Sequence, residues 1–423
     1  MNFYSIKEKT IFFTIPSILF SLLPFFLITG PFLSDFVISL IGLLFLIYCV
    51  RTKNFVFFKN KFFYFFLLFW IYLVLNSLLN NFNLSSFKIS FFYIRYGLFV
   101  VSIATLFEFD NKFIKIFFYS IFFCFVGLIF DGFYQYFSGE NIFGFKSPNP
   151  TRVSSFFHDE LILGSYLSRL WPLFFALSIL FINKKSKFYV LFITSFILSE
   201  VLIFLSGDRT AFFYINLSAI FVIIFSQKLL KLRLFILITS LFLLFLISFI
   251  NPTAKERIID KTIAQMNLEK NLNKDEKIYI FSKQHNSHYI SAYRMFLDNK
   301  FFGVGIKNFR NFCNDPKYKE NKYSCSSHPH NTYIQVLSEI GIFGFAFLIL
   351  ILFYFLKKII EHSKYKLKGK YFFNDFQICL LSALLIYLWP FVPTGNLFNN
   401  WLNIILILNL PFFIWNRKLN KTI

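Results

Sequence analysis

The chain has 423 residues, of which 57% are hydrophobic, and its mean hydropathy is +0.61. Apolar runs of about 20 residues, the length that crosses a bilayer, recur throughout and exclude a soluble domain with one core. The net charge of +22 could indicate a nucleic-acid partner, but the basic residues gather in short segments between the apolar runs, so none is expected. We predict an all-α polytopic membrane protein, with residues 1–423 forming a single integral membrane domain.

In chain order, the apolar runs predict about twelve transmembrane helices. Basic residues gather in alternate connections, which the positive-inside rule places in the cytoplasm together with both termini. The same rule places three connections on the periplasmic side: residues 134–158, the hairpin 207–209, and a long loop over 251–332 between the ninth and tenth spans. The approximate spans are 11–29, 32–50, 62–80, 89–107, a fifth ending at 132, 160–182, a seventh ending at 206, 209–226, 234–250, 333–356, 376–393 and 401–415.

The long loop ends in the stretch from His328 to Phe345, HPHNTYIQVLSEIGIFGF. Thr332 and Gln335 have the spacing of a capping box, which predicts a helix that begins near 333 and runs through apolar residues to about 356. His330 is therefore expected at the mouth of a membrane helix, beside the amides of its first turn.

His330 is the residue that we expect to act as a general base. The positive end of the helix dipole disfavours imidazolium and keeps the ring neutral near pH 7. A neutral imidazole can accept a proton from a hydroxyl group. Two alternatives stay open, because His330 could be a capping or structural residue and His328 could be the base instead. Glu339, on the polar face of the same helix, could either pair with an arginine or orient the base.

Arg209 begins the eighth predicted span, directly after the hairpin. A helix dipole disfavours a positive charge in the first turn. The arginine therefore either pairs with Asp208, or extends to the membrane interface, or binds an anion there. Its planar guanidinium is suited to phosphate, which it can bind with two parallel hydrogen bonds. Arg152, in the segment 134–158, could add to such a phosphate site.

Arg294 lies inside the long loop, in a piece with an apolar face. Tyr289, Tyr293 and Phe296 form this face, which predicts a short helix at the membrane interface. Arg294 is then either solvated on the polar face or part of an anion site. Arg310 is the rival for the second role.

We expect neither a cofactor nor a metal site. The sequence has no Asp-x-Asp motif, no glycine-rich phosphate loop and no cysteine and histidine spacing typical of zinc. The cluster from His158 to Glu160 is better explained as a solvated helix cap than as a metal site. Cys313 and Cys325 could form a disulfide if the long loop is periplasmic, which the sequence leaves open.

The stretch around His330 resembles the signature of the O-antigen ligase and O-antigen polymerase superfamily. That signature is a histidine, then asparagine, serine or glutamine, nine residues, and Gly-x-x-Gly; here it is His330, Asn331, nine residues, Gly341 and Gly344. Phe345 replaces the threonine that many ligases carry next. We expect the two glycines to allow close helix packing.

The resemblance implies a membrane glycosyltransferase of the C-type architecture in the bacterial inner membrane. Its donor would be a glycan linked to undecaprenyl diphosphate on the periplasmic face. The family carries an arginine at the position of Arg209, although Phe213 replaces the leucine that follows there. Its second phosphate-binding arginine corresponds best to Arg294, with Arg310 as the rival, and Asn331 belongs to the signature itself.

The implied reaction is metal-independent and inverting. Arg209 and Arg294 would hold the diphosphate, and His330 would deprotonate the acceptor hydroxyl, so that no protein nucleophile is needed. The spacing favours a ligase, whose acceptor is the lipid A-core, over a polymerase, whose acceptor is a lipid-linked repeat unit or growing chain. Transfer of the glycan to a protein is a third possibility. A flippase or exporter of lipid-linked glycan is the alternative from another class, but it would not need a long outer loop with histidine and arginine at a helix mouth.

Overall fold

A computed structural model describes Glu8 and residues 10–80, 83–182, 188–250, 255–266 and 279–419. Within these ranges the regular structure is helical, with no strand, as predicted. The elements in chain order are η1 (Thr10–Thr14), α2 (Ile15–Ser21), α3 (Leu23–Thr29), α4 (Pro31–Thr52), η2 (Val56–Phe58), α5 (Lys61–Leu79), α6 (Leu84–Phe92), α7 (Ile94–Phe109), α8 (Lys112–Ser138), η3 (Ser155–Phe157), α9 (Leu163–Phe181), α10 (Tyr189–Leu205), α11 (Arg209–Phe225), α12 (Leu230–Ile250), η4 (Glu256–Asp260), α14 (Lys261–Gln265), α15 (Lys283–Asp298), α16 (Phe309–Phe312), α17 (Thr332–Leu367), α18 (Asp375–Leu388) and α19 (Asn400–Leu419).

Seven helices of the described chain are long and apolar enough to cross a membrane: α4, α5, α6 with α7, α8, α9, α12 and α17. The first two apolar helices, which meet at a 54° bend, would make an eighth span. The apolar helices α10, α11 and α18 are shorter. Each of the twelve predicted ranges holds a helix. The prediction of a helical membrane protein is therefore confirmed, whereas the number of twelve spans stays a prediction.

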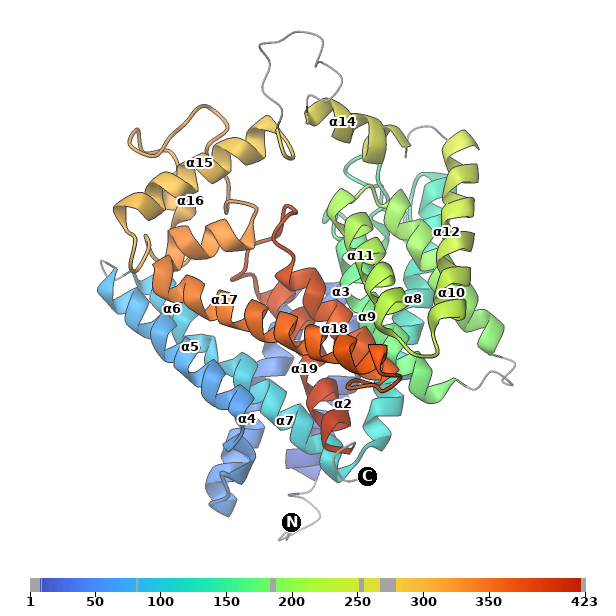
Figure 1. The fold of residues 1–423 in the computed structure, drawn as a ribbon, viewed down its shortest axis with the longest axis horizontal. Coiled ribbons are helices and arrows are strands. Elements are labelled where there is room, and N and C mark those ends of the chain that lie inside the picture. The colour runs from blue at the N-terminus through green and yellow to red at the C-terminus, as the bar shows by residue number, and fades with distance from the viewer. Residues whose placement is uncertain are drawn as a thin grey trace.

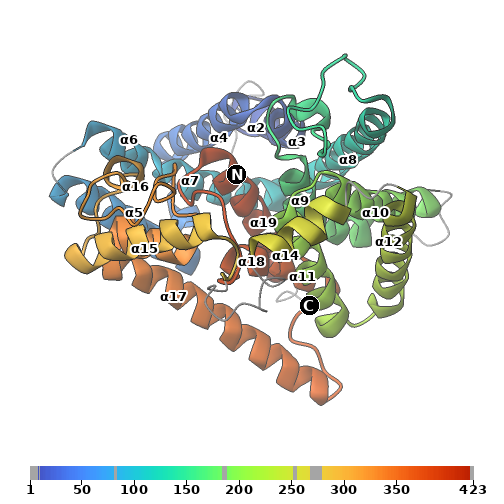
Figure 2. The same ribbon diagram turned by 90° about the horizontal axis from the view of Figure 1, so that it is seen from above.

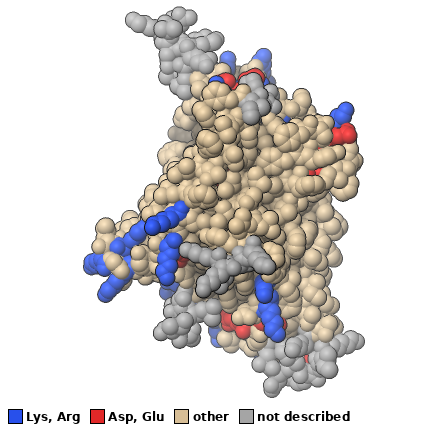
Figure 3. Space-filling view, turned by 90° about the vertical axis from the view of Figure 1, so that its right-hand side faces the viewer, with Lys and Arg blue, Asp and Glu red and all other residues tan. Residues whose placement is uncertain are grey.

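Helix α9 lies at the centre of the bundle. It packs against α8, α10, α11 and α18, and nearly every side chain from Leu163 to Ser178 is buried. The short helices α14, α15 and α16 lie together at one end, and the long α17 crosses the front of the bundle (Figure 1). Charged side chains gather towards the two ends of the face in Figure 3 and leave a broad uncharged zone between them. Such a zone suits a lipid environment.

Two arginines inside the apolar helices have partners in neighbouring helices. Arg95 of α7 forms an ion pair with Asp35 of α4, at 2.9 Å between Nε and Oδ1. Arg169 of α9 has its guanidinium 4.7 Å from the ring centres of both Tyr214 and Tyr387. Because an isolated charge is costly in a membrane, these contacts hold α4 to α7 and α9 to its neighbours.

The segment between α12 and α17, predicted as a long loop, contains the helical elements η4, α14, α15 and α16 among its described residues. Met295 of α15 packs with Phe309 of α16 and with Tyr318 in an apolar cluster of its own. A disulfide joins Cys313 and Cys325, the pair that the sequence left open. Together the apolar cluster and the disulfide form a small folded unit that packs on α17 (Figure 2).

Helix α17 is interrupted at Gly341, where φ is 65° and ψ is −169°. The turn that follows α15 fills the interruption. Val304 N donates to Ser338 O at 2.8 Å, and Gly305 N donates to Glu339 O at 2.8 Å. Carbonyl groups that lose their helical partners at the break are thus satisfied by another segment.

Gly341 corrects an expectation about the Gly-x-x-Gly pair. We expected both glycines to allow close helix packing, but Gly341 adopts a conformation that side chains disfavour and admits the backbone of Phe301. A Cβ atom built on Gly341 would lie 2.2 Å from Phe301 O. Gly344, in contrast, is helical and contacts the side chain of Ile340 in its own helix. Periodicity in the sequence carries no information on φ, so the break could not be foreseen.

Candidate active site

His330 lies in the turn immediately before α17, with a left-handed φ of 57°. The N-cap of the helix is Asn331, whose Oδ1 accepts hydrogen bonds from Tyr333 N at 3.0 Å and Ile334 N at 3.2 Å. The Asn331 amide also donates to Pro390 O at 2.8 Å. The predicted position of His330 at a helix mouth is therefore confirmed, and an asparagine cap fixes it there.

The expected capping box at Thr332 and Gln335 is wrong. Thr332 is already the first helical residue, and its hydroxyl lies 3.0 Å from the hydroxyl of Thr394. The Gln335 amide nitrogen donates to Glu339 at 2.9 Å and to Asn396 at 2.9 Å. Both side chains point toward the connection between α18 and α19, because Asn331 caps the helix in their place.

Four of the six histidines form one cluster, in which three rings surround that of His330. Its ring centre lies 4.1 Å from that of His328, 5.3 Å from that of His288 and 5.5 Å from that of His285. His285 and His288 come from the first turns of α15 and lie three residues apart, on one face. We did not single out these two residues from the sequence. The only local signal for them was the His-x-x-His spacing in a segment predicted to be amphipathic.

Hydrogen bonds distinguish His330 from its neighbour His328. His328 Nε2 donates to Thr394 O at 3.0 Å, and its Nδ1 lies 2.9 Å from Ser327 Oγ, so both ring nitrogens are engaged. His330 Nε2 lies 3.0 Å from Ser326 Oγ. Its Nδ1 has no hydrogen-bond partner among the described residues. This arrangement favours His330 over His328 as the group that accepts a proton.

The surroundings of the four rings favour their neutral forms. Burial lowers the pKa of His330 below its usual value. Burial and the proximity of His330 lower the pKa of His285 and of His288 to about 4, and that of His328 to about 3. All four imidazoles are therefore neutral near pH 7, as a general base requires.

A cluster of arginines surrounds the hairpin before α11. Arg152 Nε donates to Ser206 O at 2.8 Å, and Arg209 Nε donates to Arg257 O at 3.1 Å. A Cβ atom built on Gly207 would lie 2.8 Å from Arg152 Cγ and 3.3 Å from Arg257 Cγ, so both side chains pass over the glycine. Burial, together with the charge of Arg257, lowers the pKa of Arg152, and the charge of Asp208 only partly opposes this.

This arginine cluster (Arg152, Arg209 and Arg257) has unused capacity for an anion. Arg257 Nε is buried with no hydrogen-bond partner within the described part of the chain. The partners of Arg209 are the carbonyl of Arg257 and the side-chain oxygen of Gln265, neither of which is charged. The nearby Asp208 caps α11 by accepting from Ala211 N at 3.1 Å. The charge of Arg209 contributes to the low pKa of His285, so this arginine lies within electrostatic range of that histidine.

Residues 193–349 match the family model of the O-antigen ligase. The match includes His330, both α15 histidines, Arg209 and Arg257, but not Arg152. It supports the resemblance to the O-antigen ligase and polymerase superfamily, whose members are membrane glycosyltransferase or ligase-type enzymes. No protein among the curated sequences matches the chain.

The region matched by the family model also contains Arg294 and Arg310, two predicted residues that lie apart from the arginine cluster. Arg294 is held by an ion pair with Glu320 and donates to Lys319 O at 2.9 Å. It lies nine residues after His285, about two and a half turns of α15, and so on the opposite side of the helix. Arg310 is exposed on α16, although its charge contributes to the low pKa of His328.

Glu339 is fully buried and has no ion-pair partner among the described residues. Its carboxylate accepts hydrogen bonds from Gln335 Nε2 at 2.9 Å and from Phe309 N at 3.3 Å. Glu339 thus fixes the start of α16 against α17. From the sequence, Glu339 could have paired with an arginine or oriented the base. Its observed contacts instead join α16 to α17, and so position the folded unit beside the site.

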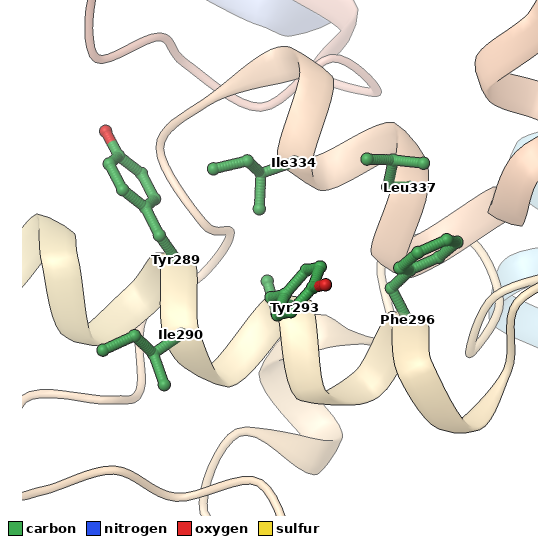
Figure 4. Close-up of a pocket in the computed structure, with 7 residues that line it drawn as sticks. Tyr289, Ile290, Tyr293, Phe296, Ile334 and Leu337 are labelled. Atoms are coloured by element: carbon green, nitrogen blue, oxygen red, sulfur yellow. The ribbon is translucent and has the colours of Figure 1, made fainter.

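An apolar groove of about 300 Å³ runs between α15 and the first turns of α17. Figure 4 shows Tyr289, Tyr293 and Phe296 on one side, facing Ile334 and Leu337 on the other. The first of these tyrosines follows the histidine cluster in α15. The predicted apolar face of the α15 helix therefore packs beside α17 and leaves an apolar surface next to the site.

No group of three or more described His, Cys, Asp or Glu side chains has an arrangement that could hold a metal ion. His158 is exposed, and its ring centre lies 4.0 Å from that of Phe145. The residues from His158 to Glu160 precede α9 at the surface.

Proposed function

We propose that the protein transfers a glycan from undecaprenyl diphosphate to a lipid A-core hydroxyl on the periplasmic face of the bacterial inner membrane. The observation that carries this proposal is that a base and an anion site share one region: His330 lies at a helix mouth with the ring centre of His285 5.5 Å away, and the charge of Arg209, from the arginine cluster, acts on His285. The match to the O-antigen ligase model over residues 193–349 supports the reaction class.

In the proposed reaction, the arginine cluster binds the diphosphate of the donor. Arg209 and Arg257 neutralise the charge that develops on the diphosphate as it leaves. We assign the second arginine to Arg257 rather than Arg294, because the Arg294 guanidinium is already paired with Glu320. Arg152, which donates to Ser206 O at the hairpin, adds to the positive potential.

His330 performs the proton transfer. Its Nδ1 accepts the proton of the acceptor hydroxyl while that oxygen forms a bond to the anomeric carbon. The bond from the anomeric carbon to the diphosphate breaks, and the electron pair leaves with the diphosphate. A single displacement of this kind inverts the anomeric configuration and needs neither a protein nucleophile nor a metal ion.

The topology predicted from the sequence supports a periplasmic site. The positive-inside rule places both termini and the basic connections in the cytoplasm and the segment from 251 to 332 outside. The disulfide between Cys313 and Cys325 suits an oxidising compartment. The apolar groove beside the histidines offers a surface for the lipid part of a substrate.

A polymerase reaction is the second candidate, because the same base and anion site would join lipid-linked repeat units. A flippase or exporter of lipid-linked glycan is less well supported, since transport alone needs no base beside an anion site. The first test is the envelope glycan profile of a deletion strain, together with its lipid-linked pool. Long chains absent from lipid A-core but accumulated on the carrier would support the ligase. Single repeat units on the core would instead support the polymerase.

Complementation with His330→Asn then tests the base. Asparagine tolerates the left-handed φ of this position, so we expect normal membrane insertion but no restoration of the glycan profile. His158→Asn, at an exposed histidine outside the site, serves as the matched control and should restore it. Full restoration by His330→Asn would refute the assignment of the base.

A further inference from the structure

The four-histidine cluster (His285, His288, His328 and His330) has a property that a lone base would not have. Its rings come from two segments, α15 and the turn before α17, and the ring centres of the other three lie between 4.1 and 5.5 Å from that of His330. A positive charge on one ring at these distances disfavours a second charge on any other. The cluster is therefore limited in the number of protons that it can hold.

Other charges around the cluster act in the same direction. Arg209, from the first turn of α11, acts on His285, and Arg310, from α16, acts on His328. No described carboxylate contributes to the pKa of any of the four rings. Backbone carbonyl groups favour protonation of His288, at Tyr323, and of His328, at Thr394, but burial and the charge of His330 outweigh both contributions.

The surroundings of the four rings are not equivalent. His328 is the most constrained, because its Nε2–H is committed to Thr394 O and its Nδ1 lies against Ser327. A proton added to Nδ1 of His328 would require the Ser327 hydroxyl to turn from donor to acceptor. The charge of His330 lowers the pKa of each of the other three rings, whereas the pKa of His330 itself is lowered by burial alone.

We propose that the four imidazoles accept a single proton between them and that His330 always holds it. His285, His288 and His328 then act as neutral positioning residues. The inference rests on the proposed role of His330 and extends it: the acceptor proton has one destination, and no neighbouring ring can compete for it. The ring of His288, stacked on that of His330 at an interplanar angle of 29°, holds the base in orientation.

The experiment measures proton occupancy directly and needs no donor or acceptor. The purified full-length protein in detergent is treated with diethyl pyrocarbonate, which modifies only neutral imidazole, at a series of pH values. Tandem mass spectrometry then gives a titration midpoint for each histidine. In the wild type, we expect the midpoint of His330 to lie above those of His285 and His288. His158, outside the cluster, is the internal control.

Two variants test which of the rings holds the proton. In His330→Asn, the midpoints of His285 and His288 should rise by on the order of one pH unit, because the charge that suppressed them is gone. In His288→Gln, the midpoint of His330 should stay close to its wild-type value, since His288 was neutral throughout.

Midpoints that coincide for the four rings, or that do not move in His330→Asn, would overturn the single-proton proposal. This outcome is distinguishable from failure of the proposed function. A protein that titrates as expected but transfers no glycan would retain the single-proton cluster and lose the glycosyltransferase assignment.

Discussion

Replacing Gly341 with alanine should separate the folded unit around α15 from α17. The backbone at Gly341, with φ 65° and ψ −169°, lies in a region that is essentially restricted to glycine, so alanine costs about 1–3 kcal/mol in strain. The new Cβ would also lie 2.2 Å from Phe301 O, a backbone atom that cannot rotate away. Overpacking of this kind costs a further 1–3 kcal/mol or so. We expect Gly341→Ala to lose on the order of 2–6 kcal/mol of stability.

Gly369 provides a control for a positive φ without a close neighbour. Its φ is 67°, nearly that of Gly341, but nothing lies within 4 Å of a Cβ built there. Thermal unfolding in detergent can be followed with a thiol-reactive dye, because the free cysteines Cys49, Cys124 and Cys379 are buried and become accessible on unfolding. Gly341→Ala should lower the melting temperature clearly more than Gly369→Ala. Equal losses would refute the idea that the approach of Phe301 requires a glycine.

Three further predictions concern the site. Arg209→Lys keeps the positive charge but loses the planar guanidinium, and it should slow glycan transfer by about 10- to 100-fold. Arg294→Lys should slow transfer less, because Arg294 is already paired with Glu320. A larger loss in Arg294→Lys than in Arg209→Lys would contradict our choice of the diphosphate-binding arginines. Stability should fall as pH drops from 6.5 towards 4, because His285 binds a proton in the unfolded chain but stays neutral in the folded protein. The stability that neutral His285 contributes is fully present above pH 6.5, and its loss on acidification is at most about 3 kcal/mol before solvent screening. Chemical-denaturation midpoints that stay constant over this pH range would count against this prediction. EDTA should leave transfer unchanged, since arginines are proposed to stabilise the leaving diphosphate; strong inhibition would point to a metal ion.

The helices could be predicted because hydropathy is local. Each predicted span contains a helix, and His330 lies at the head of α17 as its neighbours indicated. The residue that caps α17 was nevertheless misidentified. Asn331 and Thr332 are both of residue types that cap helices. The Thr332 hydroxyl is engaged with Thr394, in a connection distant in sequence, whereas Asn331 caps the helix.

The anion site could be predicted only in part. Arg209 was recognisable because an arginine in the first turn of a helix opposes the helix dipole. Arg257, His285 and His288 were not recognised, since their proximity to Arg209 and His330 depends on how the segment between α12 and α17 folds. Arg294 matched the family pattern in sequence, yet the rotation of α15 turns it towards Glu320.

The connection between α18 and α19 has a consequence for the order of biogenesis. Thr394 in that connection accepts from His328 and donates its backbone N–H to His330 O at 2.8 Å. The two partners of the His328 contact are 66 residues apart in the chain. When α17 has just been synthesised, the turn that holds His328 and His330 therefore still lacks its contacts with Thr394. The site can reach the observed arrangement only after α18 and the connection that follows it have been made, so a chain that ends before Thr394 would lack a completed active site.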